Sequence, residues 1–195
     1  MHRFYYNHTI PGDVLFILLE PNEKVISSAK KGDVTILYGE KEVVGYNIFN
    51  ASSYVSNLKD GAIFEEDQIL LSKVNAALIK VNEKPLEPNP RSGYIVATIT
   101  KLEEHPLLEK SYIVTLSIGE KEVTSVSSYK NLEASKKVVV ITDGTLDKYG
   151  NKFSSHIEKN IPIDVLITSP VDLKLEGDNN QAYLVSLEEG VDFFA

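Results

Sequence analysis

A cluster of lysines beside an aromatic ring offers the clearest chemistry in this sequence. Lys130, Lys136 and Lys137 lie close together in the chain, and Tyr129 and Asn131 flank the first of them. Lysine ammonium groups neutralise phosphates, an aromatic ring stacks on an unpaired base, and an amide exchanges hydrogen bonds with base edges. These five residues are therefore the predicted RNA-binding site, although the same composition is also typical of a solvated loop beside a buried strand.

The sequence lacks the residue patterns of common catalytic and cofactor sites. It has no cysteine, and its histidines, at positions 2, 8, 105 and 156, are not paired at the spacing of a helical metal site. It contains no Gly-x-Ser-x-Gly elbow and no glycine-rich phosphate loop. We therefore expect no enzymatic activity, no cofactor and no bound metal, and we expect His2 and His8 to lie on the surface.

The chain carries a formal net charge of −8, shared between its halves. Residues 1–90 hold 9 basic and 12 acidic side chains, and residues 91–195 hold 11 and 16. Because non-specific binding to nucleic acids depends on Lys and Arg meeting phosphates, this balance opposes it, and no DNA partner is expected. No apolar run reaches the roughly 18 residues of a membrane span, and the N-terminus lacks a signal-peptide pattern. We predict a cytoplasmic protein without a membrane partner.

A proline-rich segment divides the chain. Between Asn82 and Ser92, three prolines fall within six residues, which neither a helix nor a central strand accommodates. We predict an N-terminal module over residues 1–84 and a C-terminal domain over residues 91–195.

The N-terminal module should combine strands with one helix. Short β-rich runs at residues 14–19, 34–38 and 43–49 are separated by turn-forming residues such as Pro21-Asn22. After Asp67, a suitable N-cap, apolar residues recur at spacings of three and four on one helix face: Leu70, Val74, Ala77, Leu78 and Val81. The pattern predicts a small α+β fold.

The C-terminal half changes to a period of two. Between residues 111 and 118, every second residue is apolar: Tyr112, Val114, Leu116 and Ile118. Because successive side chains of a strand point to opposite faces, this pattern is typical of a strand with one buried face. Further β-rich runs lie at residues 94–102, 122–126, 137–142, 163–168 and 183–187. Five or six short strands in this length favour a small closed barrel or a sandwich.

Two N-terminal motifs resemble the N-terminal domain of the YtpR family. The first is Phe4–Asn7 followed by Gly12–Leu15, and the second is the longer run Gly45–Tyr54. The family joins this module to a C-terminal tRNA-binding OB-fold domain, similar to those of the phenylalanyl-tRNA synthetase beta chain, the methionyl-tRNA synthetase C-terminus and the EMAP-II cytokine. The resemblance implies a five-stranded OB-fold barrel in residues 91–195, tRNA or another RNA as partner, and a translation-associated role.

The C-terminal half keeps part of the family's pattern and lacks part of it. Gly93–Val96, His105-Pro106 and Lys137–Val140 match the family's opening strand, its turn and a later strand. The family's Cys-Gly-Ala-Pro-Asn loop is represented by Ser127–Asn131, which keeps only the asparagine. Its Ser-x-Gly-Met pattern with a following Cys-Ser is replaced by Ile163–Ser169, which keeps only the final serine.

Two hypotheses about function follow. The first is non-catalytic binding of tRNA or structured RNA by the C-terminal barrel, which the lysine cluster and the family pattern favour. The alternative is a protein-interaction module with a degenerate OB-fold that has lost RNA binding and docks a translation factor or a second copy of the chain. The acidic charge and the replaced motifs favour this alternative.

Overall fold

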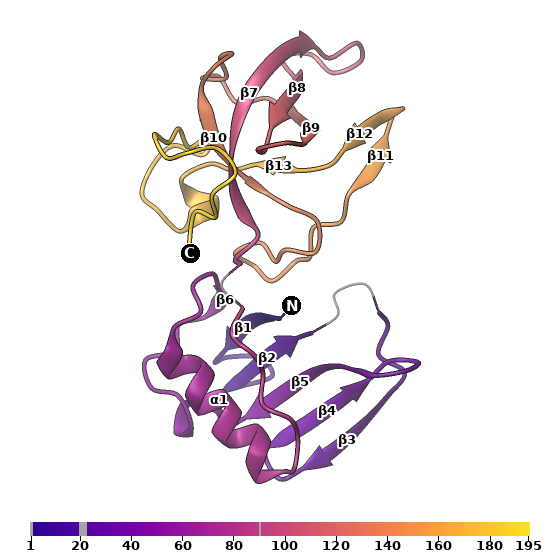
Figure 1. The fold of residues 1–195 in the computed structure, drawn as a ribbon, viewed down its shortest axis with the longest axis vertical. Coiled ribbons are helices and arrows are strands. Elements are labelled where there is room, and N and C mark those ends of the chain that lie inside the picture. Colours follow the sequence, from indigo (N-terminus) through magenta and orange to yellow (C-terminus); the bar gives the residue numbers. More distant parts are fainter. Residues whose placement is uncertain (1, 20–22, 90) are drawn as a thin grey trace. The chain divides into compact units, whose positions relative to one another are not determined.

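The computed structural model describes residues 2–19, 23–89 and 91–195, and the chain divides into two compact units (Figure 1). The first unit spans Met1–Ser92 and the second spans Gly93–Ala195. The fold is mainly β, with a single α-helix in the described part of the chain, which confirms the predicted fold class. The predicted turn at Pro21-Asn22 lies outside the described residues.

The N-terminal unit is built on a six-stranded antiparallel sheet with the order β3-β4-β5-β2-β1-β6. Its strands are β1 (Arg3–Asn7), β2 (Val14–Leu18), β3 (Ser27–Lys31), β4 (Val34–Tyr38), β5 (Val43–Phe49) and β6 (Gly61–Ile63). The helix α1 (Gln68–Lys80) lies along this sheet, and residues of both share one apolar core. A short 3₁₀ helix, η1 (Ala51–Ser53), follows β5. This is the predicted α+β arrangement.

The helix begins where the sequence predicts. Asp67 is the N-cap, and its carboxylate accepts a hydrogen bond of 2.6 Å from the backbone N–H of Leu70. This bond satisfies one of the backbone donors that the first turn leaves without an intrahelical partner. The apolar face predicted from the spacing is buried against the sheet through Leu70, Val74 and Leu78.

Three strands of this sheet, β1, β3 and β6, were not predicted from the sequence. β3 and β6 form the two edges of the sheet, so each is paired on one side only. β3 is mostly polar and largely exposed, which is usual for an edge strand and removes the apolar signal.

In the interior of the sheet, a Cβ atom at Gly45 would lie 2.5 Å from the carbonyl oxygen of Ile17, so glycine permits the close approach of β5 to β2.

The described part of the proline-rich segment, residues 82–89 and 91–92, is held against the N-terminal unit. The side-chain amide of Asn75 on α1 accepts a bond from the backbone N–H of Leu86 (2.7 Å) and donates one to its carbonyl (3.0 Å). Further along, the Glu66 carboxylate accepts the N–H of Asn89 (2.8 Å). The segment therefore forms a strap on this unit.

The first residues of the chain hold the same strap. The Asn89 side chain donates to the carbonyl of His2 (2.9 Å), and Arg3 donates to the carbonyl of Arg91 (2.6 Å). His2 is 6% exposed and its ring pairs with the Glu66 carboxylate. The expectation of a surface position is therefore wrong for His2, because this pair and the strap cover the ring, whereas His8 is exposed as predicted.

The C-terminal unit is a five-stranded antiparallel sheet, with the order β13-β10-β7-β8-β9, that curls into a nearly closed barrel. Its strands are β7 (Tyr94–Glu104), β8 (Tyr112–Ser117), β9 (Glu122–Ser127), β10 (Lys137–Ile141) and β13 (Leu166–Ile167). The first strand pairs with the second and the fourth, as in an OB-fold. The alternating side chains of β8 point inward as predicted, since Val114 and Leu116 are fully buried in the barrel core.

Contacts between β9 and the segment leading into β13 close the barrel. The backbone N–H groups of Asp164 and Val165 donate to the carbonyl of Thr124 (2.8 and 3.4 Å). In return, the N–H of Thr124 donates to the Asp164 carboxylate (2.9 Å). Asp164, which stands where the family's motif is replaced, thus takes part in barrel closure.

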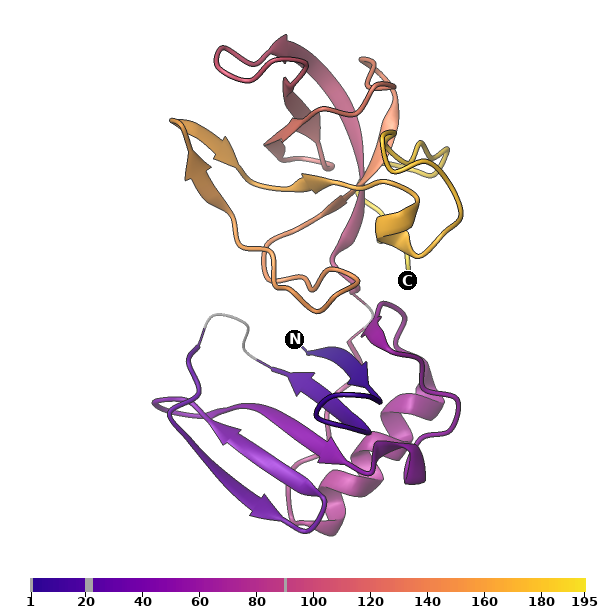
Figure 2. The same cartoon turned by 180° about the vertical axis from the view of Figure 1, so that it is seen from behind.

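Two expected strands differ in the structure. The run at 163–168 contains the last residue of β12 (Ile161–Ile163) and β13, and β12 pairs with β11 (His156–Glu158) in a hairpin that Figure 2 shows. Residues 183–187 form no strand and meet β10 through one bridge, between Val138 and Leu184. The reason is that β7 occupies one edge of β10 and β13 occupies part of the other, at Val140 and Ile141, which leaves little edge to pair with. A second 3₁₀ helix, η2 (Val171–Leu173), follows β13.

No helix in the described ranges is both long and apolar enough to cross a membrane. Within the same ranges, no group of three or more His, Asp or Glu side chains is arranged to hold a metal ion.

Candidate functional site

The five residues of the predicted RNA site lie along the β9–β10 connection and at the start of β10 in the C-terminal barrel. Tyr129, Lys130 and Asn131 belong to the connection between β9 and β10, Lys136 directly precedes β10, and Lys137 is its first residue. The C-terminal segment runs beside them, because the N–H of Lys130 donates to the carbonyl of Asn180 (3.2 Å) and the carbonyl of Lys137 accepts from Val185 (3.0 Å). The C-terminal segment thus contacts the backbone near both ends of the cluster.

Tyr129 is half-buried and packs against the barrel core. Its hydroxyl donates to the Asp172 carboxylate at 3.3 Å. Burial, followed by the nearby charge of Asp172, raises the pKa of Tyr129 to about 12. The ring is therefore fixed in position and neutral at physiological pH, with part of its surface exposed.

Asn131 uses its amide inside the protein. Its Nδ2 donates to the carbonyl of Ala182 (2.9 Å), and its Oδ1 accepts the N–H of the same residue (2.7 Å). This two-way bond fixes the C-terminal segment to the β9–β10 connection. The asparagine kept from the family's loop pattern accordingly has a structural function here.

The three lysines face solvent in different degrees. Lys130 and Lys136 are exposed, whereas Lys137 is half-buried and its ammonium donates to the carbonyl of Leu187 (2.9 Å). The cluster thus presents two exposed lysines and a third whose ammonium is bonded to a backbone carbonyl.

Carboxylates near the cluster reduce its positive potential. The pKa of Asp178 is lowered mainly because Asn180 donates hydrogen bonds to it, and the charge of Lys130 lowers it further. The pKa of Glu189 is lowered mainly by a hydrogen bond from Ser117, with a smaller effect from Lys137. Each of these two lysines therefore has a carboxylate in its vicinity, and the cluster is a modest basic patch.

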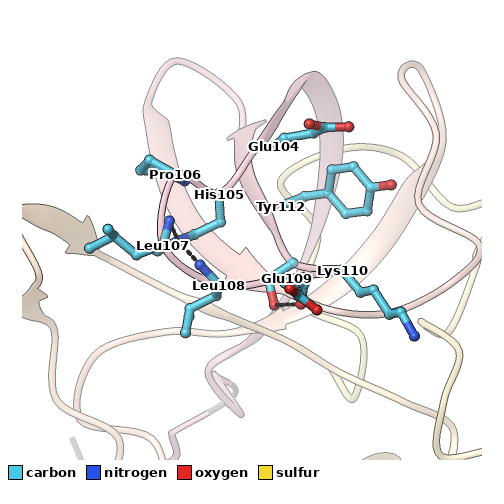
Figure 3. A pocket seen from close by; sticks show the side chains of 9 residues that line it. Glu104, His105, Pro106, Leu107, Leu108, Glu109, Lys110 and Tyr112 are labelled. Atoms are coloured by element: carbon cyan, nitrogen blue, oxygen red, sulfur yellow. Dashed lines mark hydrogen bonds between the residues drawn. The ribbon is translucent and has the colours of Figure 1, made fainter.

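A second candidate surface is the loop between β7 and β8, which encloses a hollow of about 550 Å³ (Figure 3). His105 is buried, and its Nδ1 accepts the backbone N–H groups of Leu107 (3.1 Å) and Leu108 (3.0 Å). The His-Pro turn thereby has a defined shape. Because Nδ1 accepts both bonds, the ring proton of a neutral His105 lies on Nε2.

The charges around this loop are mainly negative. Glu104 and Glu109 line the hollow beside Lys110, and Figure 3 shows the Lys110 side chain extending away from Glu104 and Tyr112. Nearby on β7, Lys101 is paired with Glu103 (2.9 Å). OB-folds commonly bind oligonucleotides through this loop and the neighbouring strand face. In this chain the lysine cluster, at the β9–β10 connection, is the more basic of the two surfaces.

Sequence reasoning missed a polar cluster in the N-terminal unit. Tyr6, Asp13 and Ser52 come from different parts of the two N-terminal motifs and meet in the structure. The N-terminal motifs were the sequence signal that could have indicated this cluster, because they contain polar residues next to the buried residues of the strands. Their spacing does not reveal which side chains converge.

Comparisons with known proteins agree with this architecture. Residues 21–83, within the N-terminal unit, match a family described as "Domain of unknown function (DUF4479)". The chain is 27% identical over 175 residues to a Bacillus subtilis (strain 168) protein named "Putative tRNA-binding protein YtpR", and this similarity covers 88% of the chain and 87% of the relative. The similarity over most of both chains, with the domain match in the N-terminal unit, supports the assignment of this protein to the YtpR family.

Proposed function

We propose that this protein is a non-catalytic RNA-binding protein whose C-terminal barrel binds tRNA. The observation that carries the proposal is the similarity to YtpR along most of both chains, because that relative's name describes tRNA binding. The strand order of the barrel supports it, since small barrels of this order commonly bind oligonucleotides. A translation-associated role in the cytoplasm is part of the same proposal.

The proposed mechanism is electrostatic positioning at the lysine cluster. Lys130, Lys136 and Lys137 contact phosphates, and the exposed part of the Tyr129 ring stacks on an unpaired base. Asn131 acts by fixing the connection that carries these groups. Because few phosphates are contacted and carboxylates lie nearby, affinity should be modest and sensitive to salt.

Titration of the full chain with fluorescent tRNA at several salt concentrations tests the proposal. In a variant with Lys130, Lys136 and Lys137 replaced by Gln, three positive charges are lost while side chains of similar reach remain. We expect weaker binding, and a slope of log affinity against log salt that is shallower by roughly two to three units. Wild-type binding that is absent at low salt would refute RNA binding by this chain.

A matched control distinguishes the cluster from general charge. Lys110, Lys121 and Lys159 are exposed on other loops of the same unit, and their replacement by Gln removes the same charge. This control should bind tRNA nearly as well as wild type. If the control loses binding and the cluster variant keeps it, the RNA binds at the loops that carry Lys110, Lys121 and Lys159, and the assigned site is wrong.

The second candidate function is protein docking by the same unit. The observation that favours it is the tip of the β7–β8 loop, where Leu107 is 68% exposed between the glutamates of the loop. An exposed leucine with acidic neighbours suits a protein surface with an apolar pocket and basic rim. The Leu107→Ser variant should leave tRNA affinity unchanged under the first proposal. It should abolish capture of a translation factor, or self-association seen by sedimentation, under the second.

A further inference from the structure

A hollow in the N-terminal unit gathers the polar residues of its motifs. It measures about 420 Å³ and is lined by Tyr6, His8, Ser52, Asn57, Leu58 and Asp60. These residues come from the end of β1, from η1 and from the turn before β6. Three separate stretches of the chain thus supply one cavity, in a unit to which RNA binding by the barrel assigns no function.

A hydrogen-bond chain fixes the wall of this cavity. The Tyr6 hydroxyl donates to Asp13 Oδ1 (2.9 Å) and lies 3.1 Å from Nδ1 of His8. The same carboxylate accepts the backbone N–H (2.9 Å) and the hydroxyl (2.7 Å) of Ser52. Asp13 itself has a φ of 44°, a conformation that a non-glycine residue rarely adopts, and the bonds of its backbone to His8 and Ala51 hold it there.

The protonation states along the chain follow from these contacts. Burial, then the hydrogen bond to Asp13, raises the pKa of Tyr6 to about 12, so its hydroxyl keeps its proton and donates it to Asp13. Burial alone would raise the pKa of Asp13, but the bonds from Ser52 and Tyr6 outweigh it and lower that pKa below its ordinary value. Asp13 is therefore an anion. A neutral His8 then donates its Nδ1 proton to Tyr6 and presents Nε2 as an acceptor.

The cavity consequently offers mainly hydrogen-bond acceptors and negative charge. Asp60 lines the cavity with a carboxylate whose Oδ1 accepts the backbone N–H of His8 (2.7 Å), and the Asp13 carboxylate lies behind Tyr6 and Ser52. A neutral His8 of this tautomer adds an acceptor at Nε2, and the Asn57 amide offers both an acceptor and donors. No lysine or arginine lines the cavity among the described residues. An anion would be repelled here, whereas a cation with several N–H donors would have its charge and its donors matched.

We propose that this cavity binds a small organic cation with an alkylammonium or guanidinium group. The cation donates to the Asp60 carboxylate and His8 Nε2, with Asn57 and Ser52 as further partners, and its aliphatic part contacts Leu58. The cavity volume lies in the range of small-ligand sites. This activity is independent of RNA binding by the barrel.

Agmatine, which carries both groups, is the probe, and binding to the full chain is followed by the backbone amide signals in ¹H–¹⁵N spectra. The signals of His8, Ser52, Asn57 and Asp60 should shift saturably. Tetramethylammonium, which has the charge without N–H donors, and 1-butanol, which has no charge, should shift them at least tenfold more weakly. Equal effects of all three compounds, or shifts located elsewhere, would overturn the proposal without any mutation.

The Asp60→Asn variant removes one charge and keeps the oxygen that accepts the His8 N–H. It should weaken agmatine binding by about ten- to a hundredfold, as expected for a charged hydrogen bond. Glu40→Gln, at an exposed turn of the same unit, is the control and should bind like wild type. Unchanged binding by Asp60→Asn would contradict the assigned site. Binding of Nα-acetylarginine amide but not agmatine would contradict a free small cation as the occupant.

Discussion

Individual residues of the predicted RNA site have two kinds of function in the structure. The lysines offer charge to solvent, whereas Asn131 and the hydroxyl of Tyr129 are engaged with Ala182 and Asp172. Composition alone could identify this cluster because basic and aromatic residues are adjacent. It could not identify the internal partners, since these lie about fifty residues later in the chain and are brought near by barrel closure.

At the residue scale, Asn131→Ala tests the structural function of this amide. The substitution leaves the N–H and the carbonyl of Ala182 without their partner. We expect the free energy of unfolding to fall by about 1–3 kcal/mol, measured by urea denaturation. A variant as stable as wild type would show that solvent replaces both bonds at no cost.

Three tyrosines predict a loss of stability in alkali. Burial is the largest cause that raises the pKa values of Tyr6, Tyr46 and Tyr129 to about 12, with nearby carboxylates adding to it. In the unfolded chain these hydroxyls ionise near pH 10, so the stability gained from keeping them neutral is complete below pH 10 and is lost as the pH rises towards 12. Each contributes a slope of up to about 1.4 kcal/mol per pH unit in this window.

Urea denaturation at several pH values from about 9 to about 11.5 measures this slope, and Tyr129→Phe should reduce it for the C-terminal unit. A slope equal to that of wild type would mean that Tyr129 ionises in the folded protein as it does in the unfolded chain.

At the scale of elements, the helices and strands that were predicted correctly are those with a clear apolar pattern in the sequence. The helix after Asp67 and the strand β8 have regular periods because one face of each is buried in a core. β10 instead shows an unbroken apolar run, because Val138 to Ile141 are all buried. The edge strand β3 and the hairpin of β11 and β12 have little buried surface and therefore no period. The opposite error occurred at residues 183–187, where apolar residues suggested a strand but β10 had no continuous free edge.

The cap of α1 provides a prediction for an element. Asp67→Ala removes the acceptor for the Leu70 N–H at the start of the helix that covers the sheet. The free energy of unfolding should fall by about 0.5–2 kcal/mol, and Asp67→Ser should retain most of it because serine also caps. If alanine and serine have the same effect in thermal or urea unfolding, the cap does not stabilise this helix.

At the scale of the whole molecule, the chain consists of two units with separate cores. The composition change at the prolines predicted a boundary. It could not reveal that the proline-rich strap belongs to the first unit, because the bonds from Asn75, Glu66 and Arg3 depend on the folded helix and on β1.

We expect residues 93–195 to fold alone as a barrel. The fragment retains all strands of its sheet and the C-terminal segment that binds β7, in which Gly190 donates to the carbonyl of Val96. It should show a cooperative thermal transition, and a fragment that also lacks residues 176–195 should be far less stable. A complete fragment without such a transition would show that the barrel requires the first unit.

The strap also affects how the protein withstands cleavage. Proteases usually cleave exposed connections between domains. Truncated versions of a protein are also usually designed to end at such connections. In this chain the backbone of Leu86 and Asn89 is hydrogen-bonded to side chains of the first unit. These bonds must break before a protease can bind the strap as an extended substrate, so we expect slow cleavage there. The natural place to divide the gene is therefore after Ser92. Division at residue 84 would remove a segment that the first unit uses to cover its own helix.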